Sequence, residues 1–472
     1  MDLIHILVLA LASLPFMWLI PATLRPTGLF VGSLFVIAWI LGDGGLTQLD
    51  VLLLFSTIGL TVLVWWLIQP VSNTPTEPTY RTFALIGGVV ALVWGGYALS
   101  SDAASFQIFL VLIVLSVTGG ASLSHFFHER TDSSLFHQIA LFVIYLIVVI
   151  LVVIKLPDLA RLSGYALTWD ADSLATSSPF VWIGFSYIAF RLIGLLFDFR
   201  AGRIPKTGLS LQDTITYVLF FPAFTAGPID RAQRFVPELQ AAKPLDSARL
   251  VEGGTRIAVG VFKKFVVANS LALIAMNPRL IDLTENTTGL WILLYLYAFQ
   301  IFFDFSGYSD VAIGLGRLYG ITLPENFDRP YTQANIQQFW QRWHITLSTW
   351  FRVYYFTPLS RFFITRKNKP PQYVIILISQ VTTMILIGLW HGITWNFLLW
   401  GLWHGAGLFA HKMLADNTKG WTKRVNANVW SSRVMYVGSV LATFHFVALG
   451  WVFFALPTVS DSLTMFSRLF GG

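Results

Sequence analysis

Long apolar runs recur from one end of this 472-residue chain to the other, and they constrain its fold more than any other feature. About 20 apolar residues suffice to cross a bilayer as a helix. Only 12% of the residues are charged, roughly half the share of a soluble domain. The pattern therefore predicts an all-α, polytopic integral membrane protein with 10 to 13 membrane segments. The apolar segments lie approximately at 4–20, 28–41, 51–69, 83–99, 105–122, 135–155, 180–197, 214–226, 256–276, 289–303, 374–390, 393–411 and 434–456.

The whole chain, 1–472, is interpreted as one integral-membrane domain. Its longest polar interval, roughly 227–254, is too short for a soluble domain. Residues 1–178 carry few polar residues of motif type, whereas 180–455 mix Trp, Gly, Pro, His, Asn and Arg into apolar stretches. Chemistry is therefore expected in the second part. The first apolar run has no basic segment before it, so we interpret it as a retained helix or signal anchor.

The net charge of +7 fits the excess of basic residues on the cytoplasmic side of membrane proteins better than an anionic partner, and no nucleic-acid partner is expected. The loop at 156–179 is more acidic and is predicted to lie outside. Cysteine is absent, which excludes disulfides, zinc–thiolate sites, iron–sulfur clusters and an enzyme-bound thioester. The basic clusters predicted to be cytoplasmic are Arg200, Arg203 and Lys206; Arg231, Arg234, Lys243, Arg249 and Arg256; Arg361, Arg366, Lys367 and Lys369; and Lys412, Lys419, Lys423, Arg424 and Arg433.

The pentapeptide Gly388-Leu389-Trp390-His391-Gly392 recurs as Gly401-Leu402-Trp403-His404-Gly405. A histidine among Trp, Leu and Ile costs folding energy unless it is paired or used, and neutral imidazole can accept a proton. Because of its Trp-His-Gly context and the nearby Asn396, His391 is favoured as functional, at the turn of a hairpin formed by 374–390 and 393–411. For His404 a site role and a structural role both remain open. Trp390 and Asn396 are candidates to line the site.

A single surface-lying or dipping helix is predicted for 335–352, because its apolar residues recur at steps of three and four. Gln337, Gln341, His344 and Ser348 would then share one face, next to Trp340. That face could line a polar passage for a hydrophilic donor. A plain interfacial helix with a wet face is the alternative.

Upstream, Asp304 and Asp310 lie close to an apolar span, where a carboxylate is costly unless paired. Arg317 follows Asp310 by two helical turns, so a structural Asp–Arg clamp is expected. There is no HExxH pattern and no tight His/Asp/Glu cluster, so no metal site is predicted. Walker A, GxGxxG and GxSxG motifs are also absent, which argues against ATP hydrolysis and a soluble-type serine hydrolase.

Several blocks, in order, resemble membrane-bound O-acyltransferases, the MBOAT family. The resemblance covers about 180–455 and is greatest to the bacterial polysaccharide branch, typified by the alginate O-acetyltransferase membrane subunit. The teichoic-acid D-alanyl transfer protein is a relative with similar blocks. The blocks are Phe303-Asp304-Phe305-Ser306-Gly307-Tyr308-Ser309-Asp310, Pro324-Glu325-Asn326-Phe327, Phe339-Trp340-Gln341-Arg342-Trp343-His344, and the pentapeptide at 388–392 followed by Trp395, Trp400, Gly401, His404 and Gly405.

The resemblance implies a ring of tilted helices around a central tunnel. It also implies transfer of an acyl group, with acetyl favoured, from a cytoplasmic thioester to hydroxyls of an extracytoplasmic polysaccharide. His391 matches the family's essential histidine and would be the general base. His344 would orient the donor or help stabilise the oxyanion. No bound cofactor is implied; the donor would be acetyl-CoA or an acyl-carrier thioester. The location would be the bacterial inner membrane, with a periplasmic or extracellular partner acyltransferase.

Three alternatives remain open at this point. D-alanyl transfer to a cell-surface polymer would use the same class of chemistry with a carrier-protein donor. A transporter or flippase would suit broken helices and intramembrane polar residues equally well. A non-catalytic scaffold for a surface-polymer machine should survive His391→Ala, which distinguishes it from an enzyme.

Overall fold

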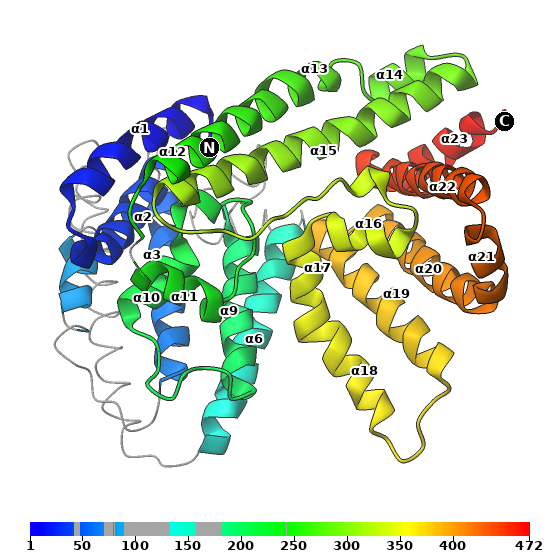
Figure 1. Cartoon of the computed structure of the whole chain (residues 1–472). Helices are drawn as coiled ribbons and strands as arrows, with labels where there is room; N and C mark the ends of the chain where they lie inside the picture. Colours follow the sequence, from blue (N-terminus) through cyan, green and yellow to red (C-terminus); the bar gives the residue numbers. More distant parts are fainter. Residues whose placement is uncertain (42–47, 70–78, 80, 89–132, 157–181, 242) are drawn as a thin grey trace, which may run out of the picture. The chain divides into compact units, whose positions relative to one another are not determined.

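Every regular element in the described part of the chain is a helix, which confirms the all-α prediction (Figure 1). The computed structural model describes residues 1–41, 48–69, 79, 81–88, 133–156, 182–241 and 243–472. The predicted segments at 105–122 and most of 83–99, and the 156–179 loop after its first residue, lie outside these residues.

Within the described residues, five helical stretches are long and apolar enough to span a membrane, which confirms a multi-pass membrane protein. They are Ala22–Leu41, Leu135–Lys155, Thr287–Leu318, Gln372–His391 and Val429–Ala455, and two shorter apolar helices are Leu3–Leu19 and Leu53–Leu67. The range of 10 to 13 segments and the ring around a tunnel stay predictions.

The described chain divides into two compact units. Unit 1 comprises 1–256 and 312–323, and unit 2 comprises 257–311 and 324–472. The interpretation of the chain as one membrane domain, with parts 1–178 and 180–455 of different composition, stays a prediction. Long helices cross the boundary between the two units: α12 (Ser247–Val261) and α15 (Thr287–Leu318) each contribute residues to both.

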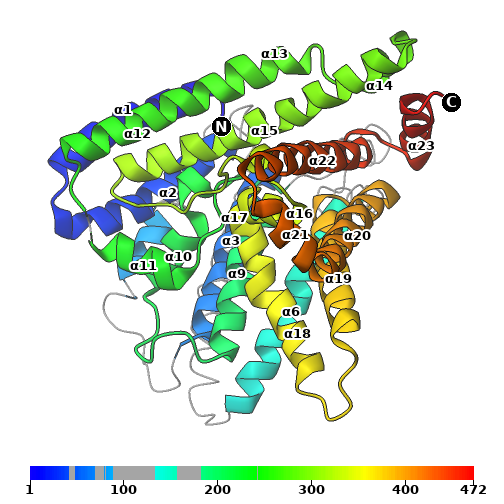
Figure 2. The same ribbon diagram turned by 45° about the vertical axis from the view of Figure 1, so that its right-hand side comes forward.

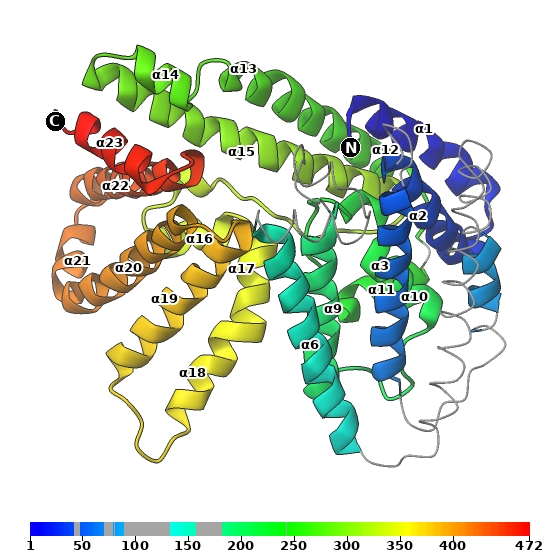
Figure 3. The same ribbon diagram turned by 180° about the vertical axis from the view of Figure 1, so that it is seen from behind.

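Unit 1 is a bundle in which α6 and α9 lie side by side and α10 packs against α2, α3 and α11 (Figure 3). Its core includes the fully buried Arg191 of α9, which donates to the carbonyls of Val218 (2.6 Å) and Ala223 (2.7 Å). These carbonyls flank the point where Pro222 interrupts the helix. Its helices are α1 (Leu3–Leu19), α2 (Arg25–Leu41), α3 (Gln48–Leu67), α6 (Ser133–Lys155), α9 (Phe185–Arg200), α10 (Leu211–Leu219), the short 3-10 turns η1 (Ala22–Leu24) and η2 (Phe221–Ala223), and α11 (Ala232–Ala241).

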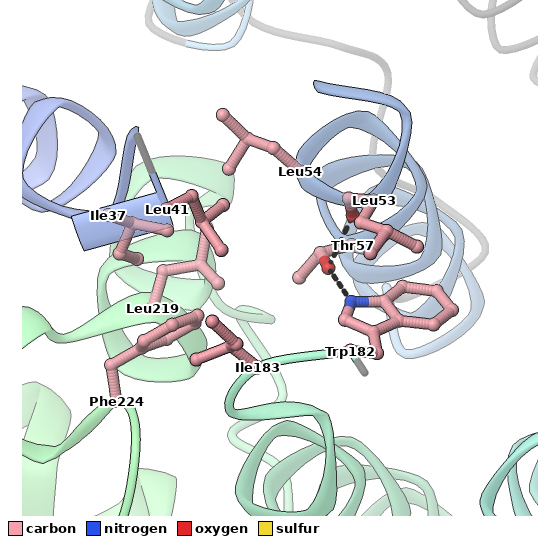
Figure 4. Close-up of a pocket in the computed structure, with 9 residues that line it drawn as sticks. All are labelled: Ile37, Leu41, Leu53, Leu54, Thr57, Trp182, Ile183, Leu219 and Phe224. Carbon is pink, nitrogen blue, oxygen red and sulfur yellow. Dashed lines mark hydrogen bonds between the residues drawn. The ribbon is translucent and has the colours of Figure 1, made fainter. Parts of the chain in front are cut away.

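A small apolar pocket lies within unit 1 (Figure 4). Its polar groups are satisfied locally, because Trp182 Nε1 donates to Thr57 Oγ1 (3.0 Å) and Thr57 Oγ1 donates to the Leu53 carbonyl (2.8 Å). With these groups occupied, the pocket offers apolar contact but no catalytic chemistry. The other lining residues are Ile37, Leu41, Leu54, Ile183, Leu219 and Phe224.

Also in unit 1, Glu238 of α11 accepts a hydrogen bond from Lys243 Nζ (2.6 Å) and one from the backbone N–H of Thr322 (3.3 Å). Burial by itself would raise the pKa of Glu238. The hydrogen bonds from Lys243 and Thr322 outweigh burial, so its pKa lies below the ordinary value of 4.5.

Unit 2 contains the motif-rich part of the chain. Its α19 and α20 form an antiparallel hairpin, and α20 also packs against α22 (Figure 2). The helix α19 ends at His391, which confirms the predicted place of this histidine at the hairpin turn. The elements are the π-helix η3 (Phe262–Ala268), α13 (Asn269–Ala272), α14 (Pro278–Leu283), the 3-10 turn η4 (Pro330–Thr332), α16 (Ile336–Arg342), α17 (Ile345–Phe351), the π-helix η5 (Arg352–Phe356), α18 (Thr357–Ile364), α19 (Gln372–His391), α20 (Trp395–Asn417), α21 (Lys419–Asn426), α22 (Val429–Ala455) and α23 (Val459–Leu469).

The glycines of the repeated pentapeptide bring the two hairpin helices together. A Cβ on Gly388 would lie 2.2 Å from the carbonyl oxygen of Phe397, and one on Gly401 would lie 2.6 Å from that of Met384. Only glycine permits so close an approach of two backbones. The repeat is therefore, in part, a packing device of the hairpin.

The two aspartates upstream are both paired with lysines of η3. Lys263 Nζ lies 2.7 Å from Asp310 Oδ2, and Lys264 Nζ lies 2.6 Å from Asp304 Oδ1. The Asp310 side chain is 9% exposed, whereas that of Asp304 is 50% exposed. Both carboxylates near the apolar span are thus paired with a cation, as expected from the free-energy cost of an unpaired charge there.

The predicted ion pair between Asp310 and Arg317 is wrong, because each of the two residues pairs with a different partner. Within unit 1, Arg317 Nη2 pairs with Glu252 Oε1 of α12 at 2.9 Å, while Asp310 pairs with Lys263 in unit 2. Two turns separate the expected partners by about 10 Å along one helix axis, so cations and carboxylates on a neighbouring helix approach more closely.

Candidate active site

The helix predicted for 335–352 is broken in the structure, and the break positions His344. The helix α16 ends at Arg342 and α17 begins at Ile345, with His344 between them in the left-handed region at φ 43°. A non-glycine residue there is strained by about 1 kcal/mol or more. The prediction of one continuous helix with Gln337, Gln341, His344 and Ser348 on one face is therefore wrong.

The cause of the break is the loop that begins at Pro324, which pairs with it through its backbone. The Asp328 N–H donates to the Arg342 carbonyl (3.0 Å), and the Ile345 N–H donates to the Asn326 carbonyl (2.9 Å). These bonds satisfy backbone groups that the helix interruption would otherwise leave open. Helical periodicity in the sequence could not reveal them, because the partners are 14 and 19 residues apart in the chain.

The side chain of Asn326 completes this arrangement. Its Oδ1 lies 3.0 Å from His344 Nδ1 and accepts from the backbone N–H (3.3 Å) and the hydroxyl (2.8 Å) of Thr346. Its Nδ2 donates to Ser309 Oγ at 3.1 Å. Asn326 is 0% exposed and His344 is 2% exposed, so the network is closed to solvent. His344 Nε2 is buried and has no hydrogen-bond partner among the described residues.

The structure brings His391 close to His344. Trp390 lies beside both rings, with ring centroids 4.6 Å from His391 and 6.3 Å from His344. His391 is only partly buried, unlike His344. The remaining aromatic neighbours of His391 are Phe454, Trp400 and Phe397, at centroid distances of 4.9, 5.5 and 6.0 Å. Two histidines 47 residues apart therefore share one aromatic environment, which spacing alone could not establish.

His404, the second histidine of the repeat, lies in a different environment. It is 0% exposed, and neither ring nitrogen has a hydrogen-bond partner among the described residues. Its ring packs against Trp400 (centroids 4.8 Å apart) and Trp340 (5.2 Å), and a Cβ on Gly450 would lie 2.8 Å from its Nε2. Trp400 in turn contacts His391. This places His404 one aromatic ring away from His391.

The other predicted site residues occupy varied positions. Gln341 is exposed on α16, and the hydroxyl of Ser348 donates to the Trp343 carbonyl (3.5 Å). The amide nitrogen of Asn396 donates to the carbonyls of Leu456 (2.6 Å) and Thr458 (3.1 Å) and to Ser462 Oγ (3.2 Å), so it joins the start of α20 to the α22–α23 connection. Whether any of them contacts substrate stays a prediction.

Asn326, Ser309 and Thr346 were not singled out from the sequence, although the first two lie in the family-like blocks. The available signal was an asparagine two residues after Pro324, which follows an apolar stretch. Among the described residues no group of three or more His, Cys, Asp or Glu side chains could hold a metal ion.

A family model described as MBOAT, membrane-bound O-acyltransferase family, matches residues 122–456. Since this match covers well over half of the chain, the protein belongs to the membrane-bound O-acyltransferase family. The match confirms the predicted family, and it begins earlier than the 180–455 region in which the resemblance was seen.

Curated relatives support the predicted branch. The chain is 36% identical over 294 residues to a probable alginate O-acetylase of Azotobacter vinelandii, covering 61% of this chain and 53% of that protein. It is 30% identical over 295 residues to a teichoic acid D-alanyltransferase of Streptococcus thermophilus, covering 59% of this chain and 69% of that protein. It is 32% identical over 272 residues to a peptidoglycan O-acetyltransferase of Helicobacter pylori, covering 57% of this chain and 49% of that protein. The matched part thus spans about half the length of the alginate relative.

Proposed function

We propose that this protein is a membrane O-acyltransferase that moves an acyl group, with acetyl favoured, from a cytoplasmic thioester to hydroxyls of an extracytoplasmic polysaccharide. The observation that carries the proposal is the meeting of His344 and His391 in one aromatic environment. Family membership supports the reaction class, and the names of two relatives, an alginate O-acetylase and a peptidoglycan O-acetyltransferase, support a polysaccharide acceptor.

The chemistry requires little beyond what these residues offer. A thioester carbonyl is already activated, so the enzyme must position the two substrates and move one proton. One histidine removes the proton of the attacking hydroxyl as the new C–O bond forms. The C–S bond then breaks, and the proton passes to the leaving thiolate. Two imidazolium ions so close together would repel, which favours one neutral ring as the base.

The donor in this proposal is acetyl-CoA or an acyl-carrier thioester, reached from the cytoplasmic side of the bacterial inner membrane. The acceptor lies on the other side, with a periplasmic or extracellular acyltransferase as the partner that completes delivery. The basic clusters assigned to the cytoplasm support this orientation.

D-alanyl transfer is the second candidate, because the relative in Streptococcus thermophilus is named a teichoic acid D-alanyltransferase and is 30% identical. The same histidine pair could serve an aminoacyl thioester. The two candidates differ in the group delivered, so chemical identification of the ester separates them.

The test compares surface polysaccharide from cells that carry wild-type protein or His391→Ala at equal membrane abundance, by NMR and mass spectrometry. Because general-base catalysis contributes about 10²–10⁴-fold, loss of one O-linked acyl group is expected. His411→Ala, a histidine of α20 outside the aromatic cluster, is the matched control and should retain the ester. Unchanged ester content in His391→Ala would overturn polysaccharide acylation and favour lipid or protein acceptors, then transport, or a scaffold.

A further inference from the structure

We propose that Asn396 is a positioning residue of the active site: it holds the connection between α22 and α23 and thereby keeps the ring of Phe454 against His391. The proposal rests on the proposed function for the reaction, with His391 as the general base. Its geometric part concerns contacts within unit 2 and does not depend on any activity. It differs from the sequence-based prediction, in which Asn396 lined the site for a substrate.

The first step is the place of Asn396 beside the turn that carries His391. The helix α19 ends at His391 and α20 begins at Trp395, so only a short turn separates the two helices. Thr394 caps α20, because its side chain accepts from the Phe397 N–H at 3.3 Å. Trp395 is 74% exposed, whereas Asn396 is 2% exposed. Asn396 is therefore buried in the protein at the same hairpin turn as His391.

The second step is the direction of the Asn396 amide. Its Nδ2 lies 2.6 Å from the Leu456 carbonyl oxygen and 3.1 Å from that of Thr458. Carbonyl oxygens only accept, so the amide atom that faces them must be the nitrogen. Leu456 is buried and directly follows α22, where carbonyls have no partner within the helix. Asn396 therefore satisfies a buried carbonyl that would otherwise cost folding free energy.

The acceptors belong to a turn that is fixed by its own hydrogen bonds. Thr458 and Asp461 form a capping box at the start of α23, in which each side chain accepts from the other residue's backbone N–H at 3.2 Å. Ser462 is fully buried, and its hydroxyl donates to the Thr458 carbonyl at 3.2 Å. Ser462 Oγ also accepts from Asn396 Nδ2 at 3.2 Å. Because this turn is rigid, its attachment to Asn396 sets where α22 ends relative to α20.

The third step is the contact between the end of α22 and His391. Phe454 lies two residues before Leu456, and its ring centroid is 4.9 Å from that of His391, with the ring planes at 74°. Phe454 also packs edge-to-face against Phe397, with centroids 5.1 Å apart. Of the four aromatic neighbours of His391 described above, Phe454 is the one that lies outside the α19–α20 hairpin. The hairpin holds the other three rings by itself, whereas the position of Phe454 depends on where α22 ends.

Another hydrogen bond joins the same two helices farther from His391. Trp403 Nε1 of α20 donates to the Phe446 carbonyl of α22 at 2.9 Å. Phe446 precedes Phe454 by two helical turns, or about 12 Å along the axis. The bond from Trp403 therefore joins α20 to α22 but does not fix the end that touches His391. A displacement of about 1 Å in an active site can cost about 10²-fold in rate, so the bonds from Asn396 are the ones that matter for the reaction.

The first experiment follows the ring of His391 directly. The full-length protein, labelled with ¹³C,¹⁵N-histidine and held in lipid nanodiscs, is measured by NMR, and the His391 signals are identified by their absence in His391→Gln. An aromatic ring shifts the signals of nuclei beside it, so Phe454→Leu shows where these signals move when the contact is lost. Asn396→Ala should move them in the same direction.

Trp403→Phe is the matched control, because it removes a hydrogen bond between the same two helices and should leave the His391 signals in place. Signals in Asn396→Ala that coincide with those of wild type would overturn the proposal, whatever the protein transfers. If Asn396→Ala does not fold, Asn396→Ser gives the same comparison with a smaller shift, since its hydroxyl keeps one donor.

The second experiment measures thiol release from acetyl-CoA in the same nanodiscs, with surface polysaccharide as the acceptor. In Asn396→Ala, kcat should fall about tenfold or more while KM for acetyl-CoA stays within about twofold, because a positioning residue does not touch the substrate. Trp403→Phe should keep the wild-type kcat. A raised KM with unchanged kcat would refute positioning and favour contact between Asn396 and substrate.

A double-mutant cycle tests whether Asn396 acts through Phe454. If it does, Asn396→Ala combined with Phe454→Leu should lose little more kcat than the more damaging single variant. Losses that multiply would refute the path through Phe454.

The two experiments also separate this role of Asn396 from the proposed function. If wild type releases no thiol and cells show no ester, the proposed function fails, while NMR still decides whether Asn396 holds Phe454 against His391. If transfer is present and the His391 signals do not respond to Asn396→Ala, the proposed function stands and Asn396 is not a positioning residue.

Discussion

Replacing Gly388 by alanine should loosen the hairpin that carries His391, and the expected cost follows from the structure. The added Cβ would lie 2.2 Å from the Phe397 carbonyl oxygen and 3.3 Å from the Gly401 nitrogen. Both are backbone atoms of α20, so no flexible side chain can move aside. One helix must shift against the other, close to the turn that holds His391.

Overpacking of this kind typically lowers the free energy of unfolding by about 1–3 kcal/mol. Because the clash here is with backbone atoms, we expect a loss of about 3 kcal/mol. Alanine recovers about 1 kcal/mol over glycine within a helix. The net loss is therefore about 2 kcal/mol. Gly438 of α22 is the matched control, because its added Cβ would have no heavy atom within 4 Å. Gly438→Ala should raise the free energy of unfolding by up to about 1 kcal/mol.

The assay is thermal unfolding of wild type and both variants in one detergent, with ester content of cells measured in parallel. Gly388→Ala should melt below wild type and Gly438→Ala at or above it. Ester content per folded molecule should fall only in Gly388→Ala, since its clash lies three residues from His391. Equal melting temperatures for the two variants would refute the close-packing argument.

Two further predictions concern charges. Lys263→Met removes the lysine paired with the 9%-exposed carboxylate of Asp310 and should lower the free energy of unfolding by roughly 3 kcal/mol. Lys264→Met, beside the half-exposed Asp304, should lower it by less than about 1 kcal/mol. Chemical or thermal unfolding compares the two variants, and equal losses would contradict the burial argument. Glu238 has a pKa below 4.5 in the folded chain, so its stabilisation is complete above that pH and is lost as pH falls through the lower folded value. The stability advantage of wild type over Glu238→Gln should therefore vanish on acidification, and an advantage independent of pH would exclude this linkage.

The sequence alone determined the class of fold. Apolar length and low charge are properties of composition and order, and the bilayer admits few structures other than helices for such a chain. The family followed from local blocks, and His391 at a hairpin turn followed from the ends of two apolar runs. None of these inferences needed a contact between distant residues.

The tertiary structure decided what the polar residues do. The periodicity of 335–352 predicted one helix, but hydrogen bonds from the loop at Asn326 divide it and hold His344 in a strained conformation. Asp310 and Arg317 share a helix, yet neighbouring helices supply their partners. The repeated pentapeptide gives two histidines with unlike surroundings, because Trp340 and Gly450 enclose only His404. Short-range patterns fix helices, since helical bonds are local; the partners of a buried polar group come from elsewhere in the chain, and only folding selects them.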